Sequence, residues 1–387
     1  GDVYKRQHWQ AGRMAQRGQA LTAGVVRGLE VATLRRAGQP TALLIEPGQG
    51  LAVNGEDVQL VRQLRCRWLD VPLVGSALTL GTAGSNLPRV GVLVLQPVVV
   101  DLANNDPSDP CERCGVEGQG GDASPVSFED ARRVDGARLL WLPWPADWAL
   151  PATELRLRNA LAHAIFAAEA RLPHGAALPW EDVGVPIALI GLDGAREPVW
   201  VDRAAVVRRG GLAREAHLQR TADGQLMASS RLGPLWQARI EQFSEHLAEL
   251  AEPDGPLPPL AKMADPFLHL PPCGLLPAGA LDLDNRHAGQ AVASPFFPPA
   301  FELDAVPVPL EQLDLAMREA ASLAPIDLSA PERLRLLVPV PQASWESRLL
   351  QRELVAKEFQ DTLDEFLVRR ARELGARQAW RHRVALL

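Results

Sequence analysis

Only two of the four cysteines, Cys111 and Cys114, stand at a spacing that could do chemistry. Two thiols three positions apart form half of a tetrahedral zinc site, in which thiolate sulfur binds the metal. The other thiols, Cys66 and Cys273, are single and distant, and the pair does not open a helix, which argues against redox use. We expect inert or loosely paired loop thiols and no cofactor. A local disulfide or a structural zinc ion at Cys111 and Cys114 is the alternative.

Trp141, Trp144 and Trp148 lie close together and are separated by prolines. Flat indole faces can stack on sugar rings, so these three residues are a candidate ligand-binding site for carbohydrate. Large aromatic rings in such a cluster are also typical of packing inside a core or between domains. We take packing as the first interpretation, with a carbohydrate- or surface-binding module as the alternative.

The sequence lacks the common catalytic motifs. It has no Gly-x-Ser-x-Gly elbow, no His-Glu-x-x-His zinc motif and no Gly-x-Gly-x-x-Gly fingerprint. None of its three lysines follows a glycine, which excludes a P-loop. His163 lies in a predicted helix, where a lone histidine is more often structural. We therefore expect no catalytic residues. An enzyme with an unrecognised site near His163 and the Cys111 loop is the second alternative.

Net charge and the length of the apolar runs limit the classes of partner that we expect. The 387 residues carry a net charge of −7, whereas proteins that bind nucleic acid or anionic lipid are usually basic. The longest apolar run, residues 90–100, is well short of the ~20 residues that a membrane helix needs and contains Pro97, so it predicts a buried strand pair and no membrane span. No signal peptide is visible, which favours a cytoplasmic or particle-associated protein. Few lysines beside many arginines indicate bacterial, GC-rich coding.

The hydrophobic pattern predicts an α+β protein that begins with a mostly antiparallel β module. Residues 1–19 are expected to be a non-native or frayed start, because residues 1–7 look like translated adaptor sequence from a metagenomic fragment. Residues 20–150 form the β-rich domain, with a hairpin at Asn54-Gly55 and a long irregular loop over 101–130. Apolar and polar residues alternate from Val58 to Trp68, as in a half-buried sheet.

The rest of the chain is expected to mix helices with a hairpin. Residues 151–252 form an α+β domain with helices over 153–172 and 234–250 and two strands between them, and the second helix carries an apolar stripe suited to another helix. Many prolines make residues 253–310 an extended arm. Residues 311–387 form a helical region with one strand and a long helix over 345–372, and further chain could follow it.

Two stretches carry a family resemblance: residues 23–31, AGVVRGLEV, and residues 45–58, IEPGQGLAVNGEDV. Their Gly-Leu and Pro-Gly pattern resembles small β modules of phage tails and phage-tail-like contractile injection systems. Residues 178–190, 201–208 and 270–277 are similar to uncharacterised bacterial proteins placed beside such loci. The resemblance implies a structural or assembly component, for example of a baseplate, that docks on other proteins of the particle. It supplies no catalytic residues.

Overall fold

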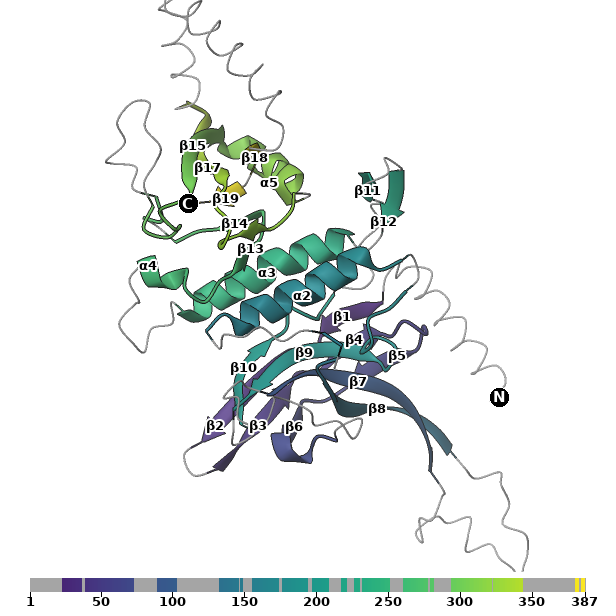
Figure 1. Ribbon diagram of the computed structural model, residues 1–387. Coiled ribbons are helices and arrows are strands. Elements are labelled where there is room, and N and C mark those ends of the chain that lie inside the picture. The colour runs from purple at the N-terminus through teal and green to yellow at the C-terminus, as the bar shows by residue number, and fades with distance from the viewer. Residues whose placement is uncertain are drawn as a thin grey trace, which may run out of the picture.

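The computed structural model describes residues 23–36, 39–72, 89–102, 132–145, 147–148, 155–173, 176–193, 197–208, 217–220, 226–229, 232–250, 260–277, 279–281, 294–321, 323–343, 380–382 and 384–386. Most of the described strands gather in two groups with a pair of helices between them (Figure 1). We call the strands within residues 24–202 the first β unit and those within 269–386 the second β unit. A separate antiparallel hairpin is formed by β11 (His217–Arg220) and β12 (Leu226–Ser229).

The first β unit begins with two small antiparallel sheets. One has the order β1 (Gly24–Gly28), β4 (Gly48–Leu51), β5 (Asp57–Leu60). The other has the order β2 (Val31–Arg36), β3 (Gln39–Ile45), β6 (Leu64–Arg67), followed by the 3-10 turn η1 (Trp68–Asp70). The hairpin predicted at Asn54-Gly55 is confirmed: it joins β4 to β5, and Gly55 has a φ of +80°.

A larger antiparallel sheet completes this unit. Its order is β10 (Pro198–Asp202), β9 (Val185–Leu192), β7 (Arg89–Leu102), β8 (Arg132–Pro143). The run expected as a strand pair is one long strand, β7. Every residue of β9 is buried, as its nearly continuous apolar sequence requires of a strand covered on both faces. No helix in the described ranges is long and apolar enough to cross a membrane.

Two helices separate the β units. The predicted helix over 153–172 is confirmed as α2 (Leu157–Arg171), and the helix over 234–250 as α3 (Leu232–Leu250). Leu235 and Ala238 of α3 belong to the core of the first unit, whereas Phe243 and Leu247 belong to the core of the second. The apolar stripe of α3 therefore serves more than one partner: Phe243 and Leu247 pack against strands as well as a neighbouring helix.

The second β unit contains parallel strands, which the sequence analysis did not foresee. Its three-stranded sheet has the order β15 (Glu302–Pro309), β17 (Arg333–Val340), β18 (Trp380–His382), all parallel. The turn η4 (Leu310–Gln312) and helix α5 (Leu313–Ala321) connect β15 to β17. Smaller elements complete it: α4 (Leu260–Met263), β13 (His269–Leu270), β14 (Cys273–Leu275), β16 (Ile326–Asp327) and β19 (Val384–Leu386).

The expected fold class is wrong. The described residues are predominantly β with a small helical part, rather than α+β ending in a long helix. The segment predicted as that helix, residues 345–372, lies outside the described residues, and the chain described after it forms β18 and β19. The excess of strand arises partly in the predicted proline-rich arm. Pro307 and Pro309 are tolerated in β15 because it is an edge strand, where one side of the backbone needs no ladder partner.

Candidate functional site

The predicted carbohydrate site lies at the core. Trp141 on β8 is 4% exposed, and its indole occupies the space that a Cβ on Gly91 of β7 would need. Its ring packs edge to face on Trp68, with 5.4 Å between the ring centroids. One face of Trp141 is thus covered by the backbone of its own sheet. This position is typical of packing rather than of a sugar-stacking platform.

The other two tryptophans make a separate aromatic chain. Trp144 is 5% exposed and contacts Trp148 edge to face at 5.3 Å, and Trp148 contacts Trp180 at 5.5 Å. The indole N–H of Trp144 donates a hydrogen bond to the carbonyl oxygen of Trp148 at 3.3 Å. The structure thus pairs Trp144 and Trp148 with Trp180, and Trp141 with Trp68, two partners that the sequence analysis did not include.

The cysteines contribute no described site. The candidate metal ligands Cys111 and Cys114 lie outside the described residues. Of the described thiols, Cys66 is half-buried and Cys273 is fully buried, and burial raises the pKa of Cys273 to about 12. Such a thiol stays protonated and is a poor nucleophile at neutral pH. In the part of the chain that the structure describes, no three His, Cys, Asp or Glu side chains converge as metal ligands.

The main polar cluster surrounds Asp202, the last residue of β10. Its carboxylate is fully buried and accepts hydrogen bonds from Arg158 Nε at 2.8 Å, Gln242 Nε2 at 2.9 Å and the backbone N–H of Ala205 at 3.0 Å. Arg158 also binds both carboxylate oxygens of Glu249, at 2.5 and 3.0 Å. The guanidinium therefore joins α2 to β10 and to α3.

The charge states in this cluster are fixed by mutual pairing. Burial acts to lower the pKa of Arg158, but the carboxylates of Asp202 and Glu249 outweigh it and raise that pKa above its ordinary value. An arginine in this setting is a permanent cation, which cannot serve as an acid or a base. The cluster is thus suited to holding three elements together and not to moving protons.

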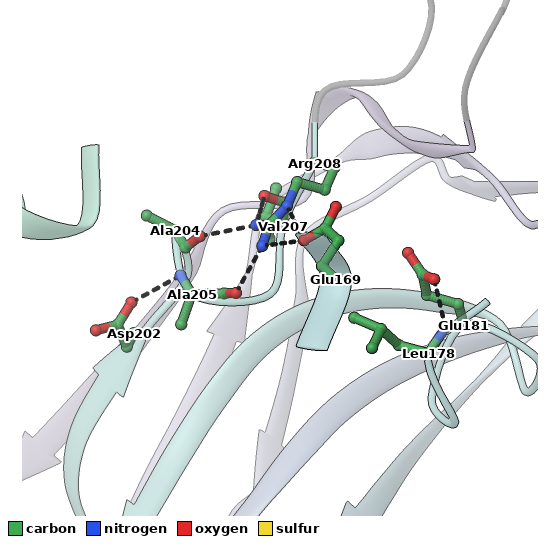
Figure 2. Close-up of polar contacts among 8 residues, drawn as sticks. All are labelled: Glu169, Leu178, Glu181, Asp202, Ala204, Ala205, Val207 and Arg208. Carbon is green, nitrogen blue, oxygen red and sulfur yellow. Dashed lines mark hydrogen bonds and ion pairs between the residues drawn. The ribbon is translucent and has the colours of Figure 1, made fainter. Parts of the chain in front are cut away.

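A second ion pair ties α2 to the segment after β10. Figure 2 shows the guanidinium of Arg208 between Glu169 and the turn that follows Asp202. Arg208 donates to Glu169 Oε2 at 2.7 and 2.9 Å and to the carbonyl oxygens of Ala204 and Ala205 at 2.9 and 3.1 Å. Both charged groups are almost fully buried. The pair fixes the turn against the end of α2.

His163, the predicted alternative catalytic residue, lies beside a different element. Its ring stacks on His269 of β13, with centroids 3.6 Å apart and planes inclined by 21°. One turn earlier on α2, Asn159 Oδ1 accepts hydrogen bonds from the N–H groups of Leu268 and His269, both at 2.8 Å, and its amide donates to the His269 carbonyl oxygen at 2.9 Å. These contacts attach α2 to the second β unit.

A cavity of about 380 Å³ lies between β1, the turn after β10 and α3. Glu241 and Glu245 line it from α3, and Arg203 and Glu30, which form an ion pair, line it from the other side. Although part of the Glu245 side chain meets solvent, burial of its carboxyl, together with the charge of Asp202, raises its pKa to about 7. The cavity therefore carries mixed charge, with one carboxyl that is partly protonated at neutral pH.

The sequence analysis missed the buried charges at the centre of the molecule. Glu169 lies four residues after Ile165 and three before Leu172, so it occupies a core-facing position of an otherwise apolar helix face. A charge at such a position signals a buried partner. That signal does not say which of the chain's many arginines the partner is.

The buried ion pairs of Asp202 and Arg208 and the hydrogen bonds of Asn159 join the two β units through α2 and α3. We take this junction as the candidate functional site. Comparison with known proteins adds no family to this description: the sequence matches no protein-family model, and no curated protein shows significant similarity to it.

Proposed function

We propose that the protein is a non-catalytic structural component of a phage-tail-like contractile particle, where it docks on other proteins. The observation that carries the proposal is the use of the buried charges. Four of the five buried Arg, Asp and Glu side chains of the described residues bind another element of the same chain, and the fifth, Glu181, binds within its own turn. The four are Arg158, Glu169, Asp202 and Arg208. Buried charged side chains that join the elements of one chain are what we expect of a scaffold.

The family-like stretches fit this role because their shared residues are structural. Gly28 of the first stretch pairs with Gly48 of the second, and a Cβ on either would collide with the backbone of the other strand. Gly28 and the buried Leu29 both take left-handed conformations, with φ of +60° and +56°. The Gly-Leu and Pro-Gly pattern is therefore what the close antiparallel pairing of β1 with β4 requires. This supports a shared β module and indicates no shared chemistry.

The direct test is native mass spectrometry of the purified chain mixed with purified sheath, tube and baseplate proteins of a contractile injection system. We expect a stable complex with at least one of them. A protein that stays monomeric and bound to none of them would contradict the proposal, as would catalytic turnover by the purified chain.

Single glutamate substitutions then locate the docking surface. Several apolar side chains are at least half exposed or close to it, so a charge there should leave the fold intact. The set is Val26, Val61, Leu155, Val199, Leu275, Leu310 and Leu315. We expect one neighbouring subset to abolish the complex while the others, as matched controls, retain it. Binding that survives every substitution would exclude these apolar residues from the interface.

A further inference from the structure

Every histidine whose side chain the structure describes lies at the attachment of the helix pair to the second β unit. His163 is on α2, His246 is on α3 and His269 is on β13. His163 and His269 stack face to face. His246 packs on Phe267 with 4.8 Å between ring centroids, and its Nδ1 has no hydrogen-bond partner among the described residues. Three imidazoles thus share one boundary.

The groups around the stacked pair are mostly cationic. His163 faces Arg239 of α3, Arg171 of its own helix and Asp327 of β16. Asp327 lies opposite His269 in the β13–β16 register and already accepts two hydrogen bonds from Ser329, at 2.6 and 2.9 Å. Asp327 is therefore the carboxylate near both imidazoles, whereas Arg239 and Arg171 both act against a positive charge on His163. Protons added here would place like charges against one another.

The stacked pair is built to be neutral. Burial, followed by the proximity of His269 and Arg239, lowers the pKa of His163 to about 4, and burial lowers the pKa of His269. A cavity of about 20 Å³ beside the rings has room for about one water molecule, through which a proton can arrive.

We propose that the stacked His163–His269 pair is an acid-sensitive latch: neutral rings hold the β13–β16 ribbon against α2, and protonation of both rings releases it while the first β unit stays folded. Two imidazolium rings at stacking distance repel each other, and the Asn159 hydrogen bonds and the apolar contacts of the buried Leu270 and Ile326 must then hold the ribbon against that repulsion. The ribbon is short, two residues in each strand, so it has little pairing of its own to resist release.

The sign of the pH dependence follows from the protons bound in each state. The closed latch binds fewer protons than the open one below the ordinary histidine pKa of about 6.5, so closure weakens as the pH falls from there toward 4. Each histidine that must take up a proton contributes about a tenfold loss of closure per pH unit. Above pH 7 the latch is closed and insensitive to pH.

Amide hydrogen exchange of Leu268 and His269 reports on the latch directly, because both N–H groups bind Asn159 when it is closed. After correction for intrinsic exchange, we expect their protection to fall at least ~100-fold between pH 6.5 and 4.5, which is the contribution of His163 alone, and His269 adds to it. Protection of the Leu93 and Ile190 amides in the first β unit should stay constant. Unchanged protection of Leu268 and His269 over this range would overturn the proposal.

The double variant His163→Phe/His269→Phe keeps two stacked rings that cannot be protonated, and we expect it to stay protected at pH 4.5. His246→Phe is the matched control: it removes a buried histidine of the same boundary, whose pKa burial also lowers to about 4, next to Arg158 and Asp202. Loss of the acid response in the control but not in the double variant would refute the latch. If the double variant does not fold, NMR titration of the unmodified protein decides, since imidazoles that protonate near pH 6.5 contradict the proposal.

Discussion

The helix pair α2–α3 is attached to the two β units by different chemistry. Toward the first unit, the polar contacts are buried ion pairs around Asp202 and Arg208, in addition to the apolar contacts of residues such as Leu235 and Ala238. Toward the second unit, they are neutral: two stacked imidazoles, the amide of Asn159 on backbone groups, and the aromatic contacts of Phe267. Both attachments have apolar contacts, but the polar part of the first depends on charge, and that of the second depends on neutral histidines.

Because of this difference, a change of pH should affect the two attachments differently. The ion pairs of the first attachment contain no histidine. The histidines of the second attachment are held neutral while it is closed, so its closure weakens as the pH falls below the ordinary histidine pKa of about 6.5. Mild acid should therefore loosen the second attachment and leave the first intact. Substitutions can break each attachment at neutral pH, and their expected costs differ.

The largest effect is expected at the first attachment. Asp202→Ala leaves the buried guanidinium of Arg158 with only the half-exposed Glu249 and strips the Ala205 N–H of its acceptor. Removing one partner of a buried ion pair costs about 3–5 kcal/mol. Urea denaturation at pH 7 should show this loss in the free energy of unfolding.

Glu249→Gln is the matched control, because it removes the other carboxylate on the same guanidinium. The Glu249 side chain is 48% exposed, so this change should cost about 1 kcal/mol or less. Equal losses in the two variants would show that burial does not distinguish the two carboxylates and that Asp202 is not the centre of the attachment.

The two β units also differ in how far the sequence predicts their strand pairing. In the first β unit, β4 and β5 are consecutive strands and the local signal Asn54-Gly55 marks their turn, so this hairpin was predictable, unlike the distant pairing of β7 with β9. In the second unit, β15 pairs with β17 across the whole of α5, and Pro307 and Pro309 disguise an edge strand as an irregular arm. Parallel pairing over such a connection leaves no short sequence pattern.

The junction was harder to predict than either sheet. Arg158 meets Asp202 at a separation of 44 residues and Glu249 at 91, and no spacing rule joins such partners. The tryptophans show the opposite difficulty: their closeness in sequence suggested one platform, but Trp141 and Trp144 are buried in different aromatic contacts. The residue types identified side chains that could take part in binding or catalysis, but only the fold determined which of them are in contact.

A smaller effect is expected at the second attachment. Asn159→Ala removes two hydrogen bonds from the N–H groups of Leu268 and His269 and one to a carbonyl oxygen, which should cost about 2 kcal/mol. The loss should fall on the β13–β16 ribbon, seen as faster amide exchange there. Asn54→Ala in the exposed β4–β5 turn, which loses two solvent-exposed hydrogen bonds with Glu56, is the control and should cost roughly 0.5 kcal/mol. A stability loss no greater than that of the control would remove Asn159 from the attachment.

The smallest effect is expected at Glu245, whose carboxyl lines the cavity beside β1 and α3. Glu245 follows Glu241 by one helical turn, and its pKa is raised to about 7, so its ionisation opposes folding. The folded state holds this proton better than the unfolded state, whose ordinary pKa is near 4.5, so its contribution to stability is present below pH 4.5 and is lost as the pH rises through 7. Glu245→Gln should stabilise the protein by a few tenths of a kcal/mol at pH 8 and leave its stability unchanged at pH 4, because the partly exposed site is screened by solvent. Glu311→Gln, on the exposed turn η4, should change neither value. Thermal unfolding at the two pH values measures both variants, and equal stabilisation by Glu245→Gln at pH 4 and pH 8 would show that the charge of this carboxyl is not what the substitution relieves.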